Sequence, residues 1–185
     1  MIKKLGFGLR GVAWICVLYP TLLPACAGTK TTFLRIQGRP DHAVRKIALN
    51  PSGGILADAI GMELLNRGFT VIDTQDTSNL FIRLGMEELE VMEPQQLRKL
   101  RDEYDIDAVL AVRAATTDSQ LIVAASVRLI STHTGGVLGG LGWENAKGGG
   151  VGSAADHMVK KGVTDAAREI VKGLIQSAGL ESQTK

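Results

Sequence analysis

The chain has 185 residues, of which 45% are hydrophobic and 22% charged, with only 2 cysteines. Two cysteines are too few for a disulfide-rich scaffold, so a chain of this length has to be held by a hydrophobic core. The 21 Lys and Arg residues are nearly balanced by 19 Asp and Glu residues, and the one basic cluster, at 98–101, is followed directly by Asp102 and Glu103. This pattern gives no reason to expect nucleic acid as a partner.

The N-terminal segment has the pattern of a secretory signal peptide. Residues 1–10 carry three basic residues and no acid, and residues 11–23 are almost wholly apolar. That run is shorter than the roughly 20 residues of a membrane-spanning helix, and Pro20 and Pro24 would interrupt one. Removal of residues 1–25 leaves 18 basic against 19 acidic residues, so the excess of basic residues belongs to the signal peptide.

Two cleavage sites are open around Cys26. Residues 23–26, Leu-Pro-Ala-Cys, resemble the lipobox of bacterial lipoproteins, whose cysteine receives a diacylglycerol and becomes the first mature residue. Residues 25–27 also satisfy the ordinary A-x-A rule, in which case Cys26 is lost and the mature chain begins near Gly28. We expect lipidation of Cys26 and membrane attachment through its acyl chains. The other cysteine, Cys16, leaves with the signal peptide.

The first part of the mature chain predicts a β-α-β unit. Residues 26–40 indicate a tether, with 33–36 as a candidate short edge strand. The spacing of apolar residues indicates the next elements, and the turn residues Asn-Pro-Ser-Gly-Gly at 50–54 separate the first strand from the helix. The expected elements are a strand over 45–49, a helix from Leu56 that Gly68 ends, and a strand over 69–73. This order favours a parallel pair of strands joined by a right-handed crossover.

The rest of the chain predicts helices, a buried strand, a hairpin and a long last helix. The expected helices cover 77–84 and 93–100, and the expected strands cover 106–113, 121–130 and 137–143. Turn residues at 131–136 join the last two strands as an antiparallel hairpin. The long helix begins with Ser153 as N-cap and Asp156 as a weak capping-box partner. Its expected inner face is Val159, Val163, Ala166, Ala167, Ile170 and Leu174.

These elements add up to one α/β (α+β) domain with a mixed sheet of about five strands and packed helices. The expected division is a signal peptide at 1–25, a lipid-anchored tether at 26–40, the α/β domain at 41–178 and a flexible tail at 179–185.

Two glycine-rich turns are candidate ligand loops. In residues 147–153, Gly150 and Gly152 precede Ser153 at the expected start of a helix, where backbone N–H groups can hold an anion. The loop follows a hairpin strand, lacks the G-K-[ST] of a P-loop and has no acid about 20 residues on, so a plain connection is favoured over nucleotide binding. The other candidate, the turn with Gly53, Gly54 and Asp58, follows the first strand of an α/β sheet, where ligands often bind, but its residues are those of any tight turn.

No catalytic or metal pattern emerges from the remaining residues. The three histidines, His42, His133 and His157, lie far apart in sequence without zinc-ligand spacing, and we expect each at the surface. Acids such as Asp73 and Asp107 fall at strand ends and in turns, where acids are common, and no two stand out as an acid and base pair. We therefore expect no catalytic residue, no metal and no cofactor.

Three stretches together resemble a known family. They are Lys-Ile-Ala-Leu at 46–49, residues 64–73, and residues 105–110 followed by 127–135. Their order resembles the α/β domain of the CsgG-like envelope lipoproteins, which include CsgG, LpoB and, more distantly, the N-terminal domain of TolB. The resemblance covers most of residues 45–175 and implies an outer-membrane lipoprotein that faces the periplasm and acts through protein contacts.

The resemblance also limits the function. Ala27 is not the aspartate that retains lipoproteins in the inner membrane of enteric bacteria, which fits delivery to the outer membrane. The connections are too short for the transmembrane hairpins of CsgG, and the long disordered arm of LpoB is missing, so an assembly, secretion or regulatory role is expected rather than an autonomous pore. A homo-oligomer is compatible with this reading. The alternative is a soluble periplasmic protein or enzyme that binds a small anion through a glycine-rich loop.

Overall fold

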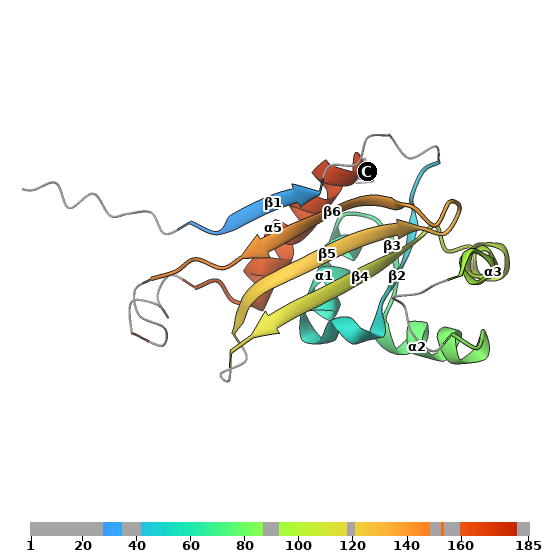
Figure 1. Ribbon diagram of the computed structural model, residues 1–185, viewed down its shortest axis with the longest axis horizontal. Helices are drawn as coiled ribbons and strands as arrows, with labels where there is room; N and C mark the ends of the chain where they lie inside the picture. The colour runs from blue at the N-terminus through green and yellow to red at the C-terminus, as the bar shows by residue number, and fades with distance from the viewer. Residues whose placement is uncertain are drawn as a thin grey trace, which may run out of the picture.

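A computed structural model describes residues 28–34, 42–86, 93–117, 121–148, 153 and 160–180. They form a single mixed α/β domain around a six-stranded sheet in the order β1-β6-β5-β4-β2-β3 (Figure 1). The strands are β1 (Lys30–Leu34), β2 (Lys46–Leu49), β3 (Thr70–Ile72), β4 (Ala108–Thr116), β5 (Ile122–Ser131) and β6 (Val137–Glu144). The helices are η1 (Pro51–Gly53), a 3-10 turn, and α1 (Gly54–Asn66), α2 (Thr74–Arg83), α3 (Pro94–Tyr104) and α5 (Val163–Ala178).

The expected β-α-β unit is confirmed. Strand β2 pairs in parallel with β3, with Ile47 opposite Val71, and in parallel with β4 on its other side, with Ala48 opposite Val109. The chain leaves α1 through Gly68, whose φ of 87° lies in the region that favours glycine. The parallel half of the sheet therefore consists of β3, β2 and β4.

The antiparallel half contains the expected hairpin. Strand β5 pairs with β4 and β6 on its two sides, and Val127 lies opposite Leu141 in β6. Ser131 closes the turn because its Oγ accepts hydrogen bonds from the N–H of His133 at 3.2 Å and of Thr134 at 3.3 Å. The turn residues predicted from sequence are thus those that hold the hairpin.

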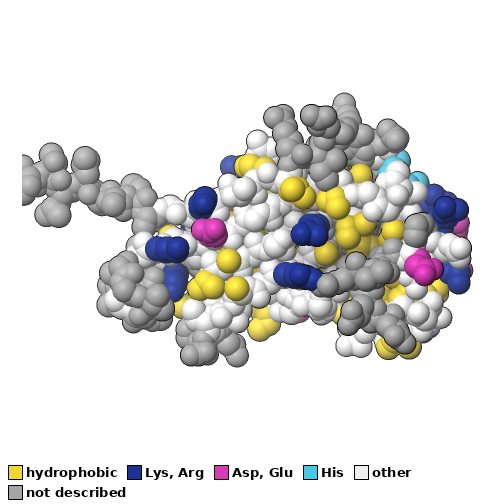
Figure 2. Space-filling view, in the orientation of Figure 1, with side chains coloured by type: hydrophobic (Ala, Val, Ile, Leu, Met, Phe, Trp, Pro, Cys, Tyr) yellow, Lys and Arg dark blue, Asp and Glu magenta, His cyan; other side chains and the backbone are white. Residues whose placement is uncertain are grey.

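Helices cover the two faces of the sheet unequally. Helices α1 and α5 lie behind the sheet in Figure 1 and pack against each other and the sheet in a core that includes Ile60, Trp143 and Leu174. On the opposite face α2 and α3 cover β2 and the start of β4 through a second core, which includes Phe81 and Leu100. The rest of that face, over β5 and β6, carries the exposed residues Ser126, Arg128 and Glu144 and is the surface seen in Figure 2.

The first strand and the last helix differ most from the expected boundaries. The candidate edge strand at 33–36 is found at Lys30–Leu34, inside the segment 26–40 assigned to the tether, and it pairs antiparallel with β6. The prediction that the last helix begins at Ser153 is wrong, because α5 begins at Val163 with Gly162 as its N-cap. Residues 160–162 are not helical, and Asp156 and Val159 lie outside the described residues. The glycine-rich loop therefore does not open α5. Leu180, assigned to the tail, is buried.

Candidate functional site

The described chain starts close to the expected lipid anchor. Cys26 lies outside the described residues, and Gly28 and Thr29 are the first that the structure places. Thr29 directly precedes β1 and donates a hydrogen bond from its Oγ1 to Oε2 of Glu169 on α5, at 2.9 Å. The N-terminal end of the domain is thereby tied to its C-terminal helix.

Glu169 is the centre of a polar cluster that we call the anchor-side cluster: Thr29, Trp143, Lys161 and Glu169. Its Oε2 also accepts the indole N–H of Trp143 at 2.9 Å, and its Oε1 pairs with Nζ of Lys161. The Trp143 side chain is fully buried between the sheet and α5, so its N–H needs an acceptor within the protein. One carboxylate thus satisfies donors from the start of β1, from β6 and from the segment before α5.

The surroundings of Glu169 favour its charged form. Partial burial raises the pKa of the carboxyl, but hydrogen bonds from Lys161, Trp143 and Thr29, with the charge of Lys161, outweigh burial and hold the pKa below its ordinary value. Glu169 is therefore a charged carboxylate, and both of its oxygens accept hydrogen bonds within the cluster. Such an arrangement holds segments together rather than leaving a carboxylate available as a base.

Asn145 fixes the neighbouring backbone. Its side-chain amide donates to the carbonyl of Ile122 at 2.8 Å and to the carbonyl of Lys161 at 3.0 Å, and its Oδ1 accepts the N–H of Lys161 at 2.9 Å. Asn145 is 6% exposed. The end of β6, the start of β5 and the approach to α5 are consequently held at one end of the sheet.

The candidate turn after β2 is explained by packing. Gly53 is buried, and a Cβ there would lie 2.5 Å from the Cβ of Ala57, so the turn needs glycine for close approach. Gly54 is exposed with a φ of 56°, which also favours glycine. Asp58 is exposed and accepts a hydrogen bond from the Thr74 hydroxyl at 3.0 Å. As the only charged residue in 50–58, Asp58 would repel an anion.

The second candidate loop is described only in part. Gly150 and Gly152 lie outside the described residues, while Ser153 is half-buried and its Oγ lies 3.4 Å from the carbonyl oxygen of Gly148. This loop follows β6, whereas the Gly53 turn follows β2, and β5 and β4 lie between those strands in the sheet. The sheet order thus does not make the two candidate loops neighbours.

Two of the histidines come together. The rings of His42, which precedes β2, and His133, in the β5–β6 turn, have centroids 3.6 Å apart at an interplanar angle of 32°. Nε2 of His42 is buried and has no hydrogen-bond partner within the described part of the chain. Burial, followed by the charges of His42 and Arg101, lowers the pKa of His133. The separation of these histidines in sequence gave no signal of the pair.

The acids at strand ends hold backbone. Oδ2 of Asp107 accepts the N–H groups of Arg45 at 2.8 Å and of Lys46 at 2.9 Å, which secures the entry into β2. Asp73 caps α2 by accepting the N–H of Asp76 at 2.7 Å. These acids therefore have structural partners.

Sequence reasoning did not find the anchor-side cluster, although part of its signal was present. Trp143 falls on the inward side of the β6 alternation with Leu141, and a buried indole needs an acceptor. Glu169 lies directly beside the inner-face residue Ile170 of α5. Nothing in the sequence, however, pairs Thr29 with a residue 140 positions away.

Among the described residues, no group of three or more metal-binding side chains occurs, and no helix is long and apolar enough to cross a membrane.

Fold and cluster together define a single mixed α/β domain whose first strand is tied to its last helix, close to a candidate lipidation site. The chain belongs to the FlgO protein family, whose family model matches residues 47–141, just over half of its length. This membership fits an envelope-associated lipoprotein. The resemblance to envelope lipoproteins is confirmed in that coarser form, while the particular likeness to CsgG, LpoB and TolB stays a prediction.

Solved structures with a related arrangement are also found. The PelC dodecamer from Paraburkholderia phytofirmans is similar at 12% identity and a TM-score of 0.45, covering 83% of this chain and 99% of that chain. The lipoprotein GNA1162 from Neisseria meningitidis is similar at 19% identity and a TM-score of 0.45, covering 70% of this chain and 98% of that chain. No curated protein matches the chain. Likeness at this level does not define a function.

Proposed function

We propose that the protein is a non-enzymatic, lipid-anchored module on the periplasmic face of the outer membrane. It supports the assembly, secretion or regulation of an envelope system through protein–protein contacts. Membership of the FlgO family supports an envelope location. The observation that carries the lipid anchor is the position of Cys26, after a signal-peptide pattern and three residues before Thr29, where the folded domain is already tied to α5.

The chemistry of attachment fits this arrangement. A lipidated cysteine with several acyl chains gains about 0.8 kcal/mol for each buried CH₂ group, and two or more chains give lasting attachment. The anchor needs no membrane-spanning helix. The domain is then free to offer its surfaces to partners.

The engagement of the ionisable groups supports a role without catalysis. Glu169 is bonded on both oxygens, Asp107 and Asp73 accept backbone N–H groups, and the Gly53 turn owes its glycines to packing and backbone conformation. Binding through exposed surface is a use that fits such a domain. The open face over β5 and β6, with Ser126 and Arg128, is one such surface.

The first experiment is to purify the protein from membranes and measure the mass of its N-terminal peptide. We expect a peptide that starts at Cys26 and carries acyl mass. The variant Cys26→Ser is the control and should leave the membrane fraction. An unmodified peptide that starts near Gly28 would overturn the lipid anchor.

The choice of membrane is tested separately. Fractionation of inner and outer membranes should place the protein in the outer membrane. The variant Ala27→Asp should shift it to the inner membrane, because aspartate at that position retains lipoproteins there in enteric bacteria. A wild-type protein found in the inner membrane would contradict the proposed location.

Protein contacts are tested by crosslinking in the cell. A photoreactive residue at position 126 or 128 samples the open face, and one at buried position 127 is the matched control. We expect crosslinks to an envelope protein or to a second copy, and native mass in detergent distinguishes these two. No crosslink from any exposed position would count against a role in protein contacts.

A further inference from the structure

The distance between the lipid anchor and the folded domain is short. Three residue steps join Cys26 to Thr29, and an extended chain spans at most about 3.6 Å per residue, so the reach is roughly 10 Å. Thr29 is hydrogen-bonded to Glu169, and Lys30 already lies in the sheet, opposite Glu144 of β6. An acylated Cys26 therefore cannot place this end of the domain far from the headgroups.

The position of that exit on the domain is also fixed. In Figure 1, β1 begins at the same end of the sheet at which β6 finishes and α5 starts. The anchor-side cluster binds these three elements through Glu169, and Asn145 ties the end of β6 to the backbone of Lys161. The anchor is therefore attached at an end of the molecule where three elements are joined, which we call the anchor end: the start of β1, the end of β6 and the start of α5.

The exposed charges at the anchor end suit an anionic surface. Lys30 begins β1 and Lys147 closely follows β6, and both side chains are exposed. The exposed acids of this end are Glu144, opposite Lys30 in the sheet, and Asp165, in the first turn of α5. Asp165 is paired with Arg168, and Glu169 is engaged with Lys161. Figure 2 shows Lys and Arg side chains gathered at this end around a single magenta group. Charges held at about one Debye length, 8–10 Å, from a headgroup layer are only partly screened from it.

We propose that the anchor end faces the membrane surface and that its partner there is the layer of phosphate-bearing lipid headgroups. This inference rests on the proposed lipid anchor. The short, tied connection sets the distance, and Lys30 and Lys147 favour the orientation. The opposite end of the domain, with α3 and the β5–β6 turn, then points away from the membrane.

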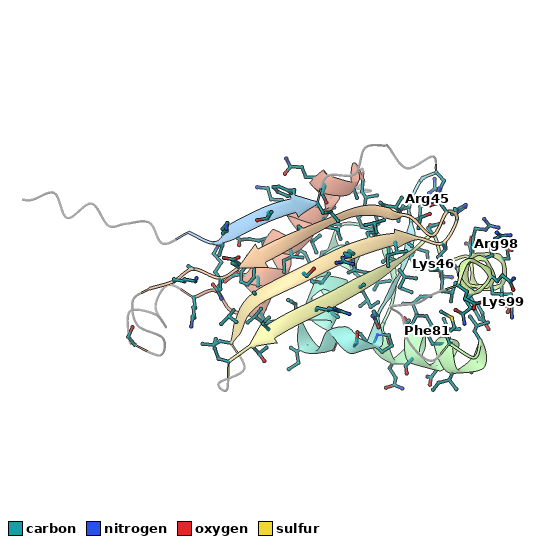
Figure 3. The ribbon with its side chains drawn as sticks, viewed as in Figure 1. Arg45, Lys46, Phe81, Arg98 and Lys99 are labelled. Atoms are coloured by element: carbon teal, nitrogen blue, oxygen red, sulfur yellow. The ribbon has the colours of Figure 1, made fainter. Side chains whose placement is uncertain are left out.

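That opposite end supplies the matched control. The ten residues of β5 span about 30 Å, and its far end carries the turn that reaches α3, where a Cβ on Gly135 would lie 3.3 Å from Leu97. Lys99 is exposed on α3 and is labelled at this end in Figure 3. Lys147 and Lys99 are thus two exposed lysines at opposite ends of one domain.

The experiment measures the distance of each end from the bilayer. Acylation blocks the Cys26 thiol, so Lys147→Cys or Lys99→Cys gives the processed chain one thiol for a fluorophore. Both variants keep Lys30 and the short connection, which is expected to set the distance by itself. The acylated full chain is placed in vesicles of phosphatidylethanolamine and phosphatidylglycerol with nitroxide on the headgroups. We expect strong quenching at position 147 and several-fold weaker quenching at position 99. A ten-residue Gly-Ser insertion between Ala27 and Gly28 should reduce the quenching at position 147.

The outcomes separate this inference from the proposed function. If mass spectrometry confirms acylation but positions 147 and 99 are quenched equally, or position 99 more strongly, the orientation is wrong and the lipid anchor stands. If the insertion leaves the quenching at position 147 unchanged, the short tether does not set the distance, and the inference fails. A processed chain without acyl mass overturns both.

Discussion

Glu169 is a single side chain on which three segments depend. Its removal leaves the indole N–H of Trp143 buried without an acceptor and frees Thr29 at the start of β1. We expect Glu169→Ala to lower the free energy of unfolding by about 1–3 kcal/mol, the usual cost of an unsatisfied buried group. Urea unfolding checks this value. Glu103→Ala, at an exposed position on α3, is the control and should stay within about 0.5 kcal/mol of the wild type.

The pair His42 and His133 predicts a loss of stability in mild acid. Burial first, and then the charges of His42 and Arg101, lower the pKa of His133 below 6.5, while Asp107 and Asp102 act in the opposite direction. The unfolded chain therefore binds this proton at a higher pH than the folded chain does. The neutral ring of His133 therefore adds to the free energy of unfolding. This contribution is complete above pH 6.5 and is lost as the pH falls from 6.5 through the pKa of His133 in the folded chain.

Urea midpoints between pH 7.5 and pH 5 measure this effect. We expect the midpoint to fall in that window for the wild type and to fall less for His133→Asn, which has no titrating ring. Glu169 contributes at lower pH, because its pKa is lowered from 4.5 and its stabilisation is lost only as the pH drops below that value. Equal pH profiles for wild type and His133→Asn would rule out the histidine pair as the cause.

At the scale of elements, β6 and α5 pack too closely for a side chain at one position. A Cβ on Gly139 would lie 2.7 Å from the backbone N and Cα of Ala178 in α5. We expect Gly139→Ala to destabilise the fold by about 1–3 kcal/mol, because the helix has to shift. Gly142 lies on the same strand with nothing within 4 Å of an added Cβ, so Gly142→Ala should have little effect in the same urea experiment. Equal losses for the two variants would contradict this account of the packing.

Local sequence patterns predict some of the strands and helices correctly and misplace others. The alternation in β5 and β6 and the turn residues at 131–136 predicted a hairpin that the structure confirms, because both signals are local. The start of the last helix was misplaced because Ser153 and the glycines before it satisfy the local rules for an N-cap. The helix begins instead after Gly162, where Asn145, at the end of β6, holds the backbone of Lys161.

Long-range contacts were the part that the sequence did not reveal. The sequence indicated β1 only as a candidate edge strand at 33–36, and no local pattern identified its partner β6, which lies more than a hundred residues later. The same holds for Thr29 with Glu169 and for His42 with His133. A buried indole needs an acceptor for its N–H, and only the fold shows that Glu169 is that acceptor for Trp143.

At the scale of the whole molecule, the two cores lie on opposite faces of one sheet and share its central strands. Successive residues of β2 and β4 alternate between them: Leu110 belongs to the core with Trp143, whereas Val109 belongs to the core with Leu100. Loss of packing in one core therefore loosens strands that the other core needs. The domain should unfold as one cooperative unit despite its two cores.

The variant Leu100→Ala tests this coupling from the side of α3. Leu100 is fully buried, so we expect a loss of about 2–5 kcal/mol. After removal of residues 1–25, Trp143 is the only tryptophan, and it reports the opposite core. Its fluorescence transition in urea should shift by the same amount as the circular dichroism transition, whereas Ile82→Ala, at a position 73% exposed, should shift neither. If the variant loses helical signal while the Trp143 transition stays in place, the second core and α3 unfold independently of the sheet.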